Sequence, residues 1–504
     1  MVMMMSSPMM LGRARLLQTK AAGATIRRAT IYLGRATAVD TATFVERAES
    51  SQSGAKLRLG GEDSHVTVTR RGVGSPYLWA KDMPRIESSK KAVTGYQSNF
   101  LQASINPYTD APANPEDKQS YVESLVLQEV IEDEGFPREA LVVSSILEDS
   151  LVQPANAGPT ERLTAEYIEK GLKIALDELK VEALDQLVVR IPDELVQSHS
   201  LRSKLNDTLA RTADILESLC ASKKIGSYGF ALPASHSSSS ILEQLLSTTF
   251  LTLSEKHSNF SALQLAMPLS TSITPLSPAL NEFKTSRDML IVADKVFEAS
   301  LSNGKPLGIR SHTSHLGEDV ALLLKSAFNL AISIERKYME TIRPENSELA
   351  LPAVEDVAWA HILANQHSQF DNLEEWIYIR ETQIFPRFEV TVKQFEAVED
   401  LKEFGFAYSM ALRELLKCFT ASVELLDASR TDSMLAALNE NNLLVSPEER
   451  LEHIAVKAAL SAGADAVLTQ EQLGKDSTLA FEAAYSPEYL ERLAACIRPA
   501  LVVE

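Results

Sequence analysis

The chain has 504 residues, of which 45% are hydrophobic and 23% are charged, and its formal net charge is −19 at pH 7. This composition is typical of a folded soluble protein, and the length suffices for one large barrel or for two or three ordinary domains. An acidic chain repels phosphate backbones, so we expect no nucleic-acid partner. The sequence contains no run of eighteen or more apolar residues, so we expect no membrane span.

The first 39 residues contain no acidic side chain. Their basic residues are Arg13, Arg15, Lys20, Arg27, Arg28 and Arg35. An acid-free, arginine-bearing start resembles a mitochondrial presequence. We therefore expect a mitochondrial protein with a transit peptide in 1–39; plastid import and a retained basic tail are the alternatives. Residues 40–65 are polar and indicate an extension or linker.

The three cysteines give no sign of a disulfide framework. Cys220, Cys418 and Cys496 are far apart in the sequence and form no CxxC pair. Reduced, partly buried thiols are the expectation for such spacing.

After residue 65, short apolar runs alternate with stretches of helical spacing. The clearest apolar runs are 140–143, 187–189, 228–232, 262–265 and 289–293. They are too short for helices, and continuous apolar runs are typical of strands covered on both faces. Between them, 121–134 and 166–179 have the spacing of amphipathic helices. This order predicts an α/β fold. Periodicity alone leaves an open sheet and a closed barrel equally possible.

The order and spacing of these segments resemble the aldo-keto reductases between about residues 66 and 484. The matching strand segments are 71–74, 99–104, 142–146, 187–192, 224–230, 263–265 and 290–293, and the closing helix and strand lie in 453–468. The resemblance implies a (β/α)8 TIM barrel of aldo-keto-reductase type in 66–504. Long helical stretches in about 316–442 form an expanded helical region before the last βα unit.

In that family, four residues at the ends of barrel strands carry the chemistry. A tyrosine exchanges the carbonyl proton, a lysine lowers its pKa, an aspartate orients the lysine, and a histidine positions the substrate. The matching positions here hold Gln102 for the aspartate, Ile146 (or Ser145 after a one-residue shift) for the lysine, and Arg190 for the histidine. Tyr108 lies near the tyrosine position. An ordinary tyrosine needs a close cation to act at neutral pH, and an arginine does not shuttle protons there.

The positions implied for the nucleotide site have also changed. The serine-asparagine pair that holds the nicotinamide carboxamide is replaced by Ala231 and Leu232, and the aromatic residue that stacks on the nicotinamide is replaced by Asp294. The last strand leads to Glu471, which would repel a phosphate. Gln264 fits the family's sixth strand but is also ordinary in a barrel interior. We therefore assign no catalytic and no cofactor-binding residues.

Other motifs favour structural roles. His312 and His315, near Glu318, have a metal-compatible spacing but no third ligand in register. Residues 72–74 lack the third glycine of a dinucleotide fingerprint, and the serine-rich stretch around His236 lacks a nucleophile elbow. We therefore expect no metal site.

Four aromatic residues lie on the predicted helices. They are Trp359, Phe370, Trp376 and Tyr378. We expect them to pack a helical core, with a partner surface as the alternative.

Together these features predict a catalytically inactive aldo-keto-reductase-like protein. It would serve as a structural, supernumerary subunit of a mitochondrial multiprotein complex, first a respiratory-chain complex such as complex I and second the mitochondrial ribosome. Other subunits would dock on the helical region 316–442. The alternatives are a divergent NADPH-dependent oxidoreductase that acts on a carbonyl substrate near Tyr108 and Arg190, and a regulatory barrel that binds nucleotide without turnover.

Overall fold

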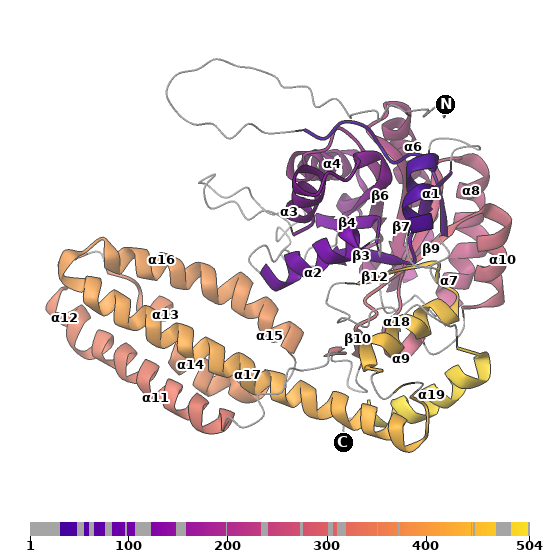
Figure 1. Ribbon diagram of the computed structural model, residues 1–504. Helices are drawn as coiled ribbons and strands as arrows, with labels where there is room; N and C mark the ends of the chain where they lie inside the picture. Colours follow the sequence, from indigo (N-terminus) through magenta and orange to yellow (C-terminus); the bar gives the residue numbers. More distant parts are fainter. Residues whose placement is uncertain are drawn as a thin grey trace, which may run out of the picture. The chain divides into compact units, whose positions relative to one another are not determined.

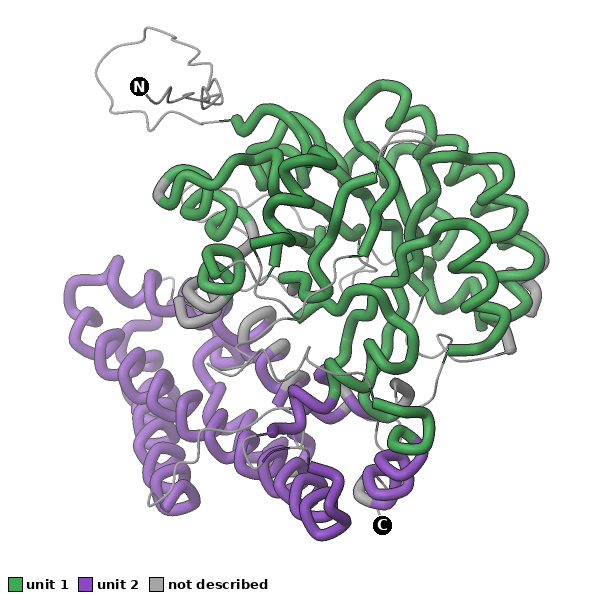
Figure 2. The backbone as a smooth tube through the Cα atoms, turned by 45° about the vertical axis from the view of Figure 1, so that its right-hand side comes forward, with its two compact units in different colours: residues 1–296, 455–490 green, residues 297–454, 491–504 purple. Residues whose placement is uncertain are grey.

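The computed structural model describes most of the chain in two compact units. The described residues are 31–47, 55–59, 65–75, 83–95, 98–105, 122–147, 158–197, 199–232, 240–272, 276–300, 306–309, 319–349, 351–370, 373–444, 446, 449–469 and 485–501. One unit comprises Met1–Val296 and Ala455–Leu490, and the other comprises Phe297–Ile454 and Glu491–Glu504 (Figure 2). Within the described ranges, no helix is long and apolar enough to cross a membrane.

The first unit is built around a closed barrel of eight parallel strands (Figure 1). Around the barrel these are β3 (Arg71–Ser75), β4 (Phe100–Ile105), β5 (Val142–Leu147), β6 (Leu184–Arg190), β7 (Ile225–Leu232), β8 (Phe260–Ala266), β9 (Leu290–Asp294) and β12 (Ala466–Thr469), which pairs with β3. Helices cover the outer face of the strands, which explains their continuous apolar runs. The predicted (β/α)8 barrel is confirmed, and an open sheet is excluded.

Helices alternate with these strands. They are α2 (Met83–Thr94), α3 (Val122–Gln128), α4 (Ala165–Leu179), α5 (Asp193–Gln197), α6 (His199–Ala221), α7 (Ser240–Leu245), α8 (Leu251–Lys256), α9 (Leu269–Ser272), α10 (Pro278–Arg287), α18 (Leu451–Ala462) and α19 (Pro487–Ala500). Helix α4 shows how the sequence sets their limits. Thr164 caps its first turn by accepting a hydrogen bond from the Tyr167 amide, and Lys180 ends it in the left-handed conformation.

The N-terminal end of the barrel is closed by a helix and a hairpin. Helix α1 (Ala38–Arg47) is followed by β1 (Ala55–Arg58) and β2 (His65–Val68), which pair antiparallel. Leu57 and Val68 are fully buried, and with Leu59 and Val66 they pack against barrel residues that include Phe100. The described parts of 40–65, which the sequence indicated as a polar extension, are therefore built into the barrel unit.

In its described residues, the second unit is helical apart from one hairpin, β10 (Glu298–Ser300) with β11 (Pro306–Gly308). Its α-helices are α11 (Val320–Lys337), α12 (Arg343–Glu345), α13 (Val354–Val357), α14 (Trp359–Gln366), α15 (Leu373–Ile379), α16 (Phe385–Glu396) and α17 (Lys402–Glu440), and it also includes residues 491–500 of α19. Helix α17 has 39 residues and spans about 58 Å at 1.5 Å per residue. The expanded helical region predicted before the last βα unit is confirmed.

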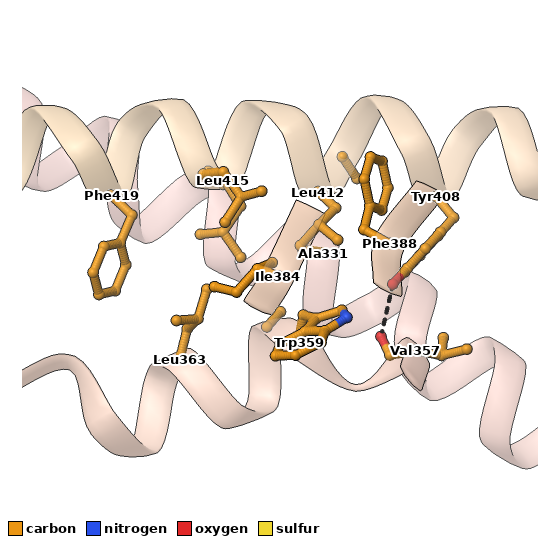
Figure 3. Packing of buried hydrophobic residues seen from close by; sticks show 14 of the residues in the cluster. Ala331, Val357, Trp359, Leu363, Ile384, Phe388, Tyr408, Leu412, Leu415 and Phe419 are labelled. Atoms are coloured by element: carbon orange, nitrogen blue, oxygen red, sulfur yellow. Dashed lines mark hydrogen bonds between the residues drawn. The ribbon is translucent and has the colours of Figure 1, made fainter. Parts of the chain in front are cut away.

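An aromatic core holds the helical unit together (Figure 3). Phe388 and Tyr408 lie 6.0 Å apart, and Trp376 lies 4.4 Å from Phe419, both between ring centroids. The Tyr408 hydroxyl donates a hydrogen bond to the Val357 carbonyl at 3.1 Å. Because these rings are buried among helices, Trp359, Phe370 and Trp376 have the core role that their spacing predicted. The side chain of Tyr378 lies outside the described residues.

Candidate functional site at the C-terminal ends of the barrel strands

A buried ion pair lies where β6 and β9 end. The Arg190 Nη2 atom is 2.8 Å from the Asp294 Oδ2 atom, and both side chains are more than nine-tenths buried. Gln264, from β8, donates its Nε2 hydrogen to the same Oδ2 atom at 2.9 Å. Arg190 also donates to the Leu232 carbonyl oxygen at 3.2 Å. Four neighbouring strands are thus joined by polar contacts. Arg190 stands at the position expected for the substrate-positioning histidine, and Asp294 at the position expected for the aromatic residue that stacks on the nicotinamide.

One side of this carboxylate has no described donor. Within the described part of the chain, neither the Asp294 Oδ1 atom nor the Gln264 Oε1 atom has a hydrogen-bond partner, although both are buried. Buried acceptors without donors are unfavourable. The cluster is therefore held in place by its ion pair and hydrogen bonds, but two of its buried oxygen atoms lack donors among the described residues.

An apolar cluster occupies the position expected for the lysine. Ile146, Val188 and Ala231 pack together and are almost completely buried. Ile146 and Val188 are register partners on β5 and β6. Ser145, the one-residue-shift alternative, is not part of this cluster, and its hydroxyl has no partner among the described residues. Neither position supplies a cation to lower the pKa of a tyrosine.

A polar layer crosses the barrel interior at Gln102. Its Nε2 atom donates to the Ser144 hydroxyl at 3.2 Å, and that hydroxyl donates to the Gln186 Oε1 atom at 3.2 Å. These three residues are consecutive register partners on β4, β5 and β6. The position of the expected aspartate thus belongs to a neutral hydrogen-bond chain, which positions side chains but does not exchange protons at neutral pH.

The glycines of β3 have a packing role. A Cβ atom on Gly72 would lie 2.8 Å from side-chain carbons of Leu468 and Phe100, and one on Gly74 would lie 3.1 Å from the Gln102 carbonyl oxygen. Side chains larger than hydrogen would therefore disturb the closure of the barrel between β12, β3 and β4. Barrel packing therefore explains Gly72 and Gly74, and no nucleotide-binding role is needed to explain them.

Several residues singled out in the sequence cannot be placed. Tyr108, His236, His312, His315, Glu318 and Glu471 lie outside the described residues. Over the described ranges, no group of three or more histidine, cysteine or acidic side chains could hold a metal ion.

The sequence identified Arg190 and Asp294 separately but did not predict that they pair. The signal was present, because oppositely charged residues end two buried strands and the C-terminal ends of barrel strands meet at one rim. Sequence reasoning also missed a second buried pair, Arg138 with Asp185, at the other end of the barrel.

No family model matches the chain, and no curated protein matches it in sequence. Similar solved structures include a glycerol dehydrogenase from Gluconobacter oxydans, which is 10% identical with a TM-score of 0.40 over 88% of this chain and 95% of that one. An aldo-keto reductase from Bacillus halodurans in its holo form is 15% identical, with a TM-score of 0.32 over 55% and 77% of the two chains. An aldo/keto reductase from Klebsiella pneumoniae, in complex with NADP and acetate, is 14% identical, with a TM-score of 0.30 over 48% and 68%. Two of these structures are described as aldo-keto reductases, and at these identities the likeness concerns the fold alone.

Proposed function

We propose that this protein is a catalytically inactive, aldo-keto-reductase-like structural subunit of a mitochondrial multiprotein complex, with a respiratory-chain complex such as complex I as the first candidate. The observation that carries the proposal is the Arg190–Asp294 ion pair. Its two residues stand where the resemblance implies a substrate-positioning histidine and a ring that stacks on the nicotinamide. Bonded to each other, they form a structural contact across the barrel.

The chemistry of carbonyl reduction supports the same conclusion. General acid-base catalysis contributes about 10²–10⁴-fold to a rate, and a tyrosine acid requires a neighbouring cation at neutral pH. The lysine position is Ile146 within an apolar cluster. Arg190, the remaining cation of this set, is engaged by Asp294 and does not release a proton at neutral pH.

Nucleotide binding is the competing function. It is favoured by the buried Gln264 and Asp294 oxygens, which lack donors among the described residues and would accept hydrogen bonds from a ligand. Purified protein titrated with NADPH to millimolar concentration separates the cases. We expect no saturable change in protein or nucleotide fluorescence. Saturable binding without aldehyde reduction would instead support a regulatory barrel, and reduction of a carbonyl would support a divergent oxidoreductase.

An exposed face of helix α17 supplies a docking surface for the proposed subunit role. Phe406 is 70% exposed and Met410 is 57% exposed. At four- and three-residue spacings they share one face of the helix with Arg413 and Lys417. We call these four residues the docking face. Large exposed apolar side chains beside cations are typical of a surface that another protein covers.

A hollow continues the docking face within the helical unit. It has a volume of about 480 Å³ and is lined by apolar side chains, by three cations (Arg380, Arg413 and Lys417) and by two acids (Glu414 and Glu424). The Arg380 and Arg413 guanidinium groups stack on the Phe385 and Phe388 rings at 5.7 and 5.1 Å, which holds cations beside apolar surface. An amphipathic helix of a neighbouring subunit, with apolar residues flanked by acidic ones, matches this combination.

The native size of the protein in a mild-detergent extract of mitochondria tests the proposal. Immunodetection on a native gel is expected to find it in the megadalton range beside respiratory-chain proteins. Migration near its own mass of 55.4 kDa, or near twice that mass, would contradict the subunit role.

Substitutions on the docking face make this test specific. Phe406→Asp with Met410→Asp should release the protein from the complex while changing its unfolding free energy by no more than about 0.5 kcal/mol. Val39→Asp is the matched control, because Val39 is 74% exposed but lies on α1 of the barrel unit. Release by the control, or retention of the double variant, would exclude this face as the contact.

A further inference from the structure

Residues 31–37 form an extended segment that pairs with the barrel unit. We call this segment the strap. Tyr32 forms a parallel bridge with Val181, its amide donates to the Lys180 carbonyl at 2.7 Å, and its carbonyl accepts from the Glu182 amide at 3.2 Å. The Tyr32 side chain is buried, and its hydroxyl donates to Glu132 at 2.9 Å. The strap thus has backbone and side-chain contacts like those of an additional edge strand.

The contacts continue along the strap. Arg35 donates from Nη2 to the Lys223 carbonyl at 2.5 Å, and the Thr37 amide donates to the Glu139 carbonyl at 2.9 Å. These partners directly precede barrel strands β7 and β5. The strap therefore lies at the N-terminal end of the barrel, opposite the candidate site.

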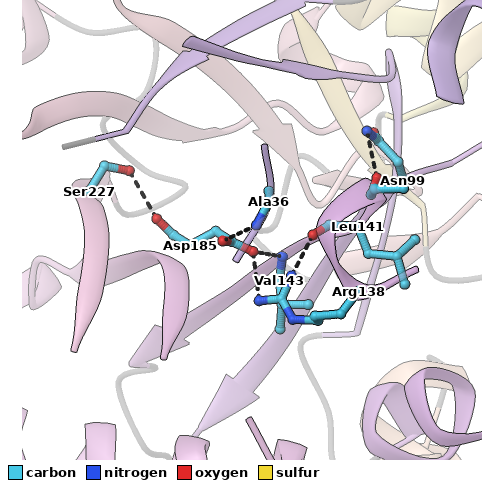
Figure 4. A network of polar contacts seen from close by, with 8 residues as sticks. Ala36, Asn99, Arg138, Leu141, Val143, Asp185 and Ser227 are labelled. Carbon is cyan, nitrogen blue, oxygen red and sulfur yellow. Dashed lines mark hydrogen bonds and ion pairs between the residues drawn. The ribbon is translucent and has the colours of Figure 1, made fainter. Parts of the chain in front are cut away.

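Near its C-terminal end, at Ala36, the strap completes a buried charge network (Figure 4). The Ala36 amide donates to the Asp185 Oδ1 atom at 2.9 Å. The other oxygen of this fully buried carboxylate accepts from Arg138 Nη2 at 2.8 Å and from the Val143 amide at 2.7 Å. Without the strap, the Oδ1 atom would lose its donor, and a buried anion with fewer donors is unfavourable.

The strap also belongs to the apolar floor of the barrel. Ala36 packs in the same cluster as Leu57 and Leu59 of the hairpin. Arg35 and Leu59 both lie against Gly226, where an added Cβ would meet the Asp185 carbonyl oxygen at 2.7 Å. After the strap, the Thr41 hydroxyl of α1 accepts from the Thr67 amide of β2 at 3.0 Å. Strap, helix and hairpin therefore form one continuous floor.

This arrangement divides the basic N-terminal segment into two parts. Arg13, Arg15, Lys20, Arg27 and Arg28 precede the strap, whereas Arg35 is built into it. We propose that the import signal ends before Ile31 and that maturation leaves the strap in the mature protein. This inference rests on the proposed mitochondrial function. The step is hydrolysis of one peptide bond before Ile31 by a processing peptidase, in which water supplies the hydroxyl of the new carboxyl terminus and a proton of the new amino terminus.

The N-terminus of the protein isolated from mitochondria tests the position of cleavage. Mass spectrometry of the N-terminal peptide is expected to find a start after Met1 and no later than Ile31. A start at Tyr32 or beyond would overturn the inference, and a start at Met1 would overturn the cleavage. Absence from mitochondria would instead contradict the proposed function, and the strap would then be judged by truncation alone.

Truncations of the recombinant chain test the strap directly. A chain that begins at Ile31 is expected to unfold at the same urea midpoint as the full chain, whereas one that begins at Ala38 is expected to unfold at a clearly lower midpoint. An unchanged midpoint for both would overturn the structural role. Since the shorter chain could fail to fold, Arg35→Ala serves as the milder variant. It should lower the midpoint, and the control Arg28→Ala, on the other side of the boundary, should not.

Discussion

Each end of the barrel contains a buried arginine–aspartate ion pair, and the two pairs differ in their surroundings. At the N-terminal end, Arg138 Nη2 lies 2.8 Å from Asp185 Oδ2, and at the C-terminal end, Arg190 Nη2 lies 2.8 Å from Asp294 Oδ2. The Asp185 carboxylate also accepts two backbone amides. Asp294 accepts one side-chain amide, and its Oδ1 atom has no partner among the described residues.

The two ion pairs differ in how many further hydrogen bonds their buried carboxylates accept. Burial of two charges is unfavourable unless further hydrogen bonds satisfy the remaining lone pairs. At the N-terminal end, the Asp185 carboxylate meets that condition and binds the Ala36 amide of the strap, although the buried Arg138 Nε atom has no partner among the described residues. At the C-terminal end, the Asp294 Oδ1 atom has no partner among the described residues, so the Arg190–Asp294 pair meets the condition less completely. Two ion pairs with the same distance between charges therefore differ in how many further hydrogen bonds their carboxylates accept.

We expect the largest loss in the free energy of unfolding at the Arg138–Asp185 pair. Asp185→Ala leaves the buried Arg138 without its anion and removes the acceptor of two backbone amides, so we expect a loss of about 3–5 kcal/mol in the free energy of unfolding. Urea unfolding followed by circular dichroism measures it. Glu399→Ala is the control, because its pair with Lys402 is exposed and should contribute no more than about 1 kcal/mol.

We expect a smaller loss in the free energy of unfolding at the Arg190–Asp294 pair. Asp294→Asn keeps the shape of the side chain but weakens the bonds from Arg190 and Gln264, and hydrogen bonds to charged groups contribute about 1.5–3 kcal/mol. The double variant Arg190→Met with Asp294→Leu should recover most of this loss, because an apolar pair removes both buried charges. If Asp294→Asn destabilised the protein as much as Asp185→Ala, the contrast between the two ends would be wrong.

A third buried acid, in the helical unit, adds a pH dependence to the comparison. Glu335 accepts the backbone amides of Ala360 and His361 at 2.5 and 3.1 Å, and lies 2.6 Å from the His361 Nδ1 atom. Burial raises the pKa of Glu335 above its ordinary value of 4.5, although these hydrogen bonds oppose the shift. Because the pKa of Glu335 is higher in the folded state than in the unfolded state, protonated Glu335 stabilises the fold. This contribution to the free energy of unfolding is complete below pH 4.5 and is lost as pH rises through the folded-state pKa.

Glu335→Gln removes this titration. As pH rises above 4.5, the unfolding free energy of the variant should improve relative to the wild type, by at most about 1.4 kcal/mol per pH unit, the slope for one proton. Tryptophan fluorescence during urea unfolding reports on the helical unit, since Trp359 and Trp376 lie in its core. A difference that does not change with pH would mean that the hydrogen bonds to Glu335 fully offset the effect of its burial.

The sequence predicts much of the barrel because each strand is a short, continuous apolar run. Val142 to Leu147 and Leu290 to Asp294 form strands close to where those runs fall. Closure was not predictable from periodicity, since open and closed parallel sheets bury their strands alike. The hairpin strand β1 was missed within the polar segment 40–65. Strand β2, which begins at the end of that segment, was also missed, although the alternation in His65-Val66-Thr67-Val68 is a weak period-two signal.

No site residues were assigned from the sequence, but several positions at the ends of the predicted strands were singled out. Gln102, Ile146, Arg190 and Asp294 were identified from their strand positions. Which of them touch depends on the register of several strands and on the tilt of a closed barrel, and neither quantity is encoded in any one segment. Opposite charges at two strand ends signalled that Arg190 and Asp294 could meet at one rim of a barrel, but which residues pair was decided only by the three-dimensional structure.

The position of the helical unit in the chain has a consequence for folding. Strand β12 closes the barrel between β9 and β3, but the whole segment from 295 to 465 separates it from β9. As the chain emerges from a ribosome or a translocation channel, the first seven strands of the barrel are available before the segment 295–465 has been delivered. The barrel cannot close until β12 follows that segment. During that time β3 and β9 expose unpaired edges, which promote association between chains. A chaperone requirement that ends when residue 469 becomes available would be the kinetic signature of this topology.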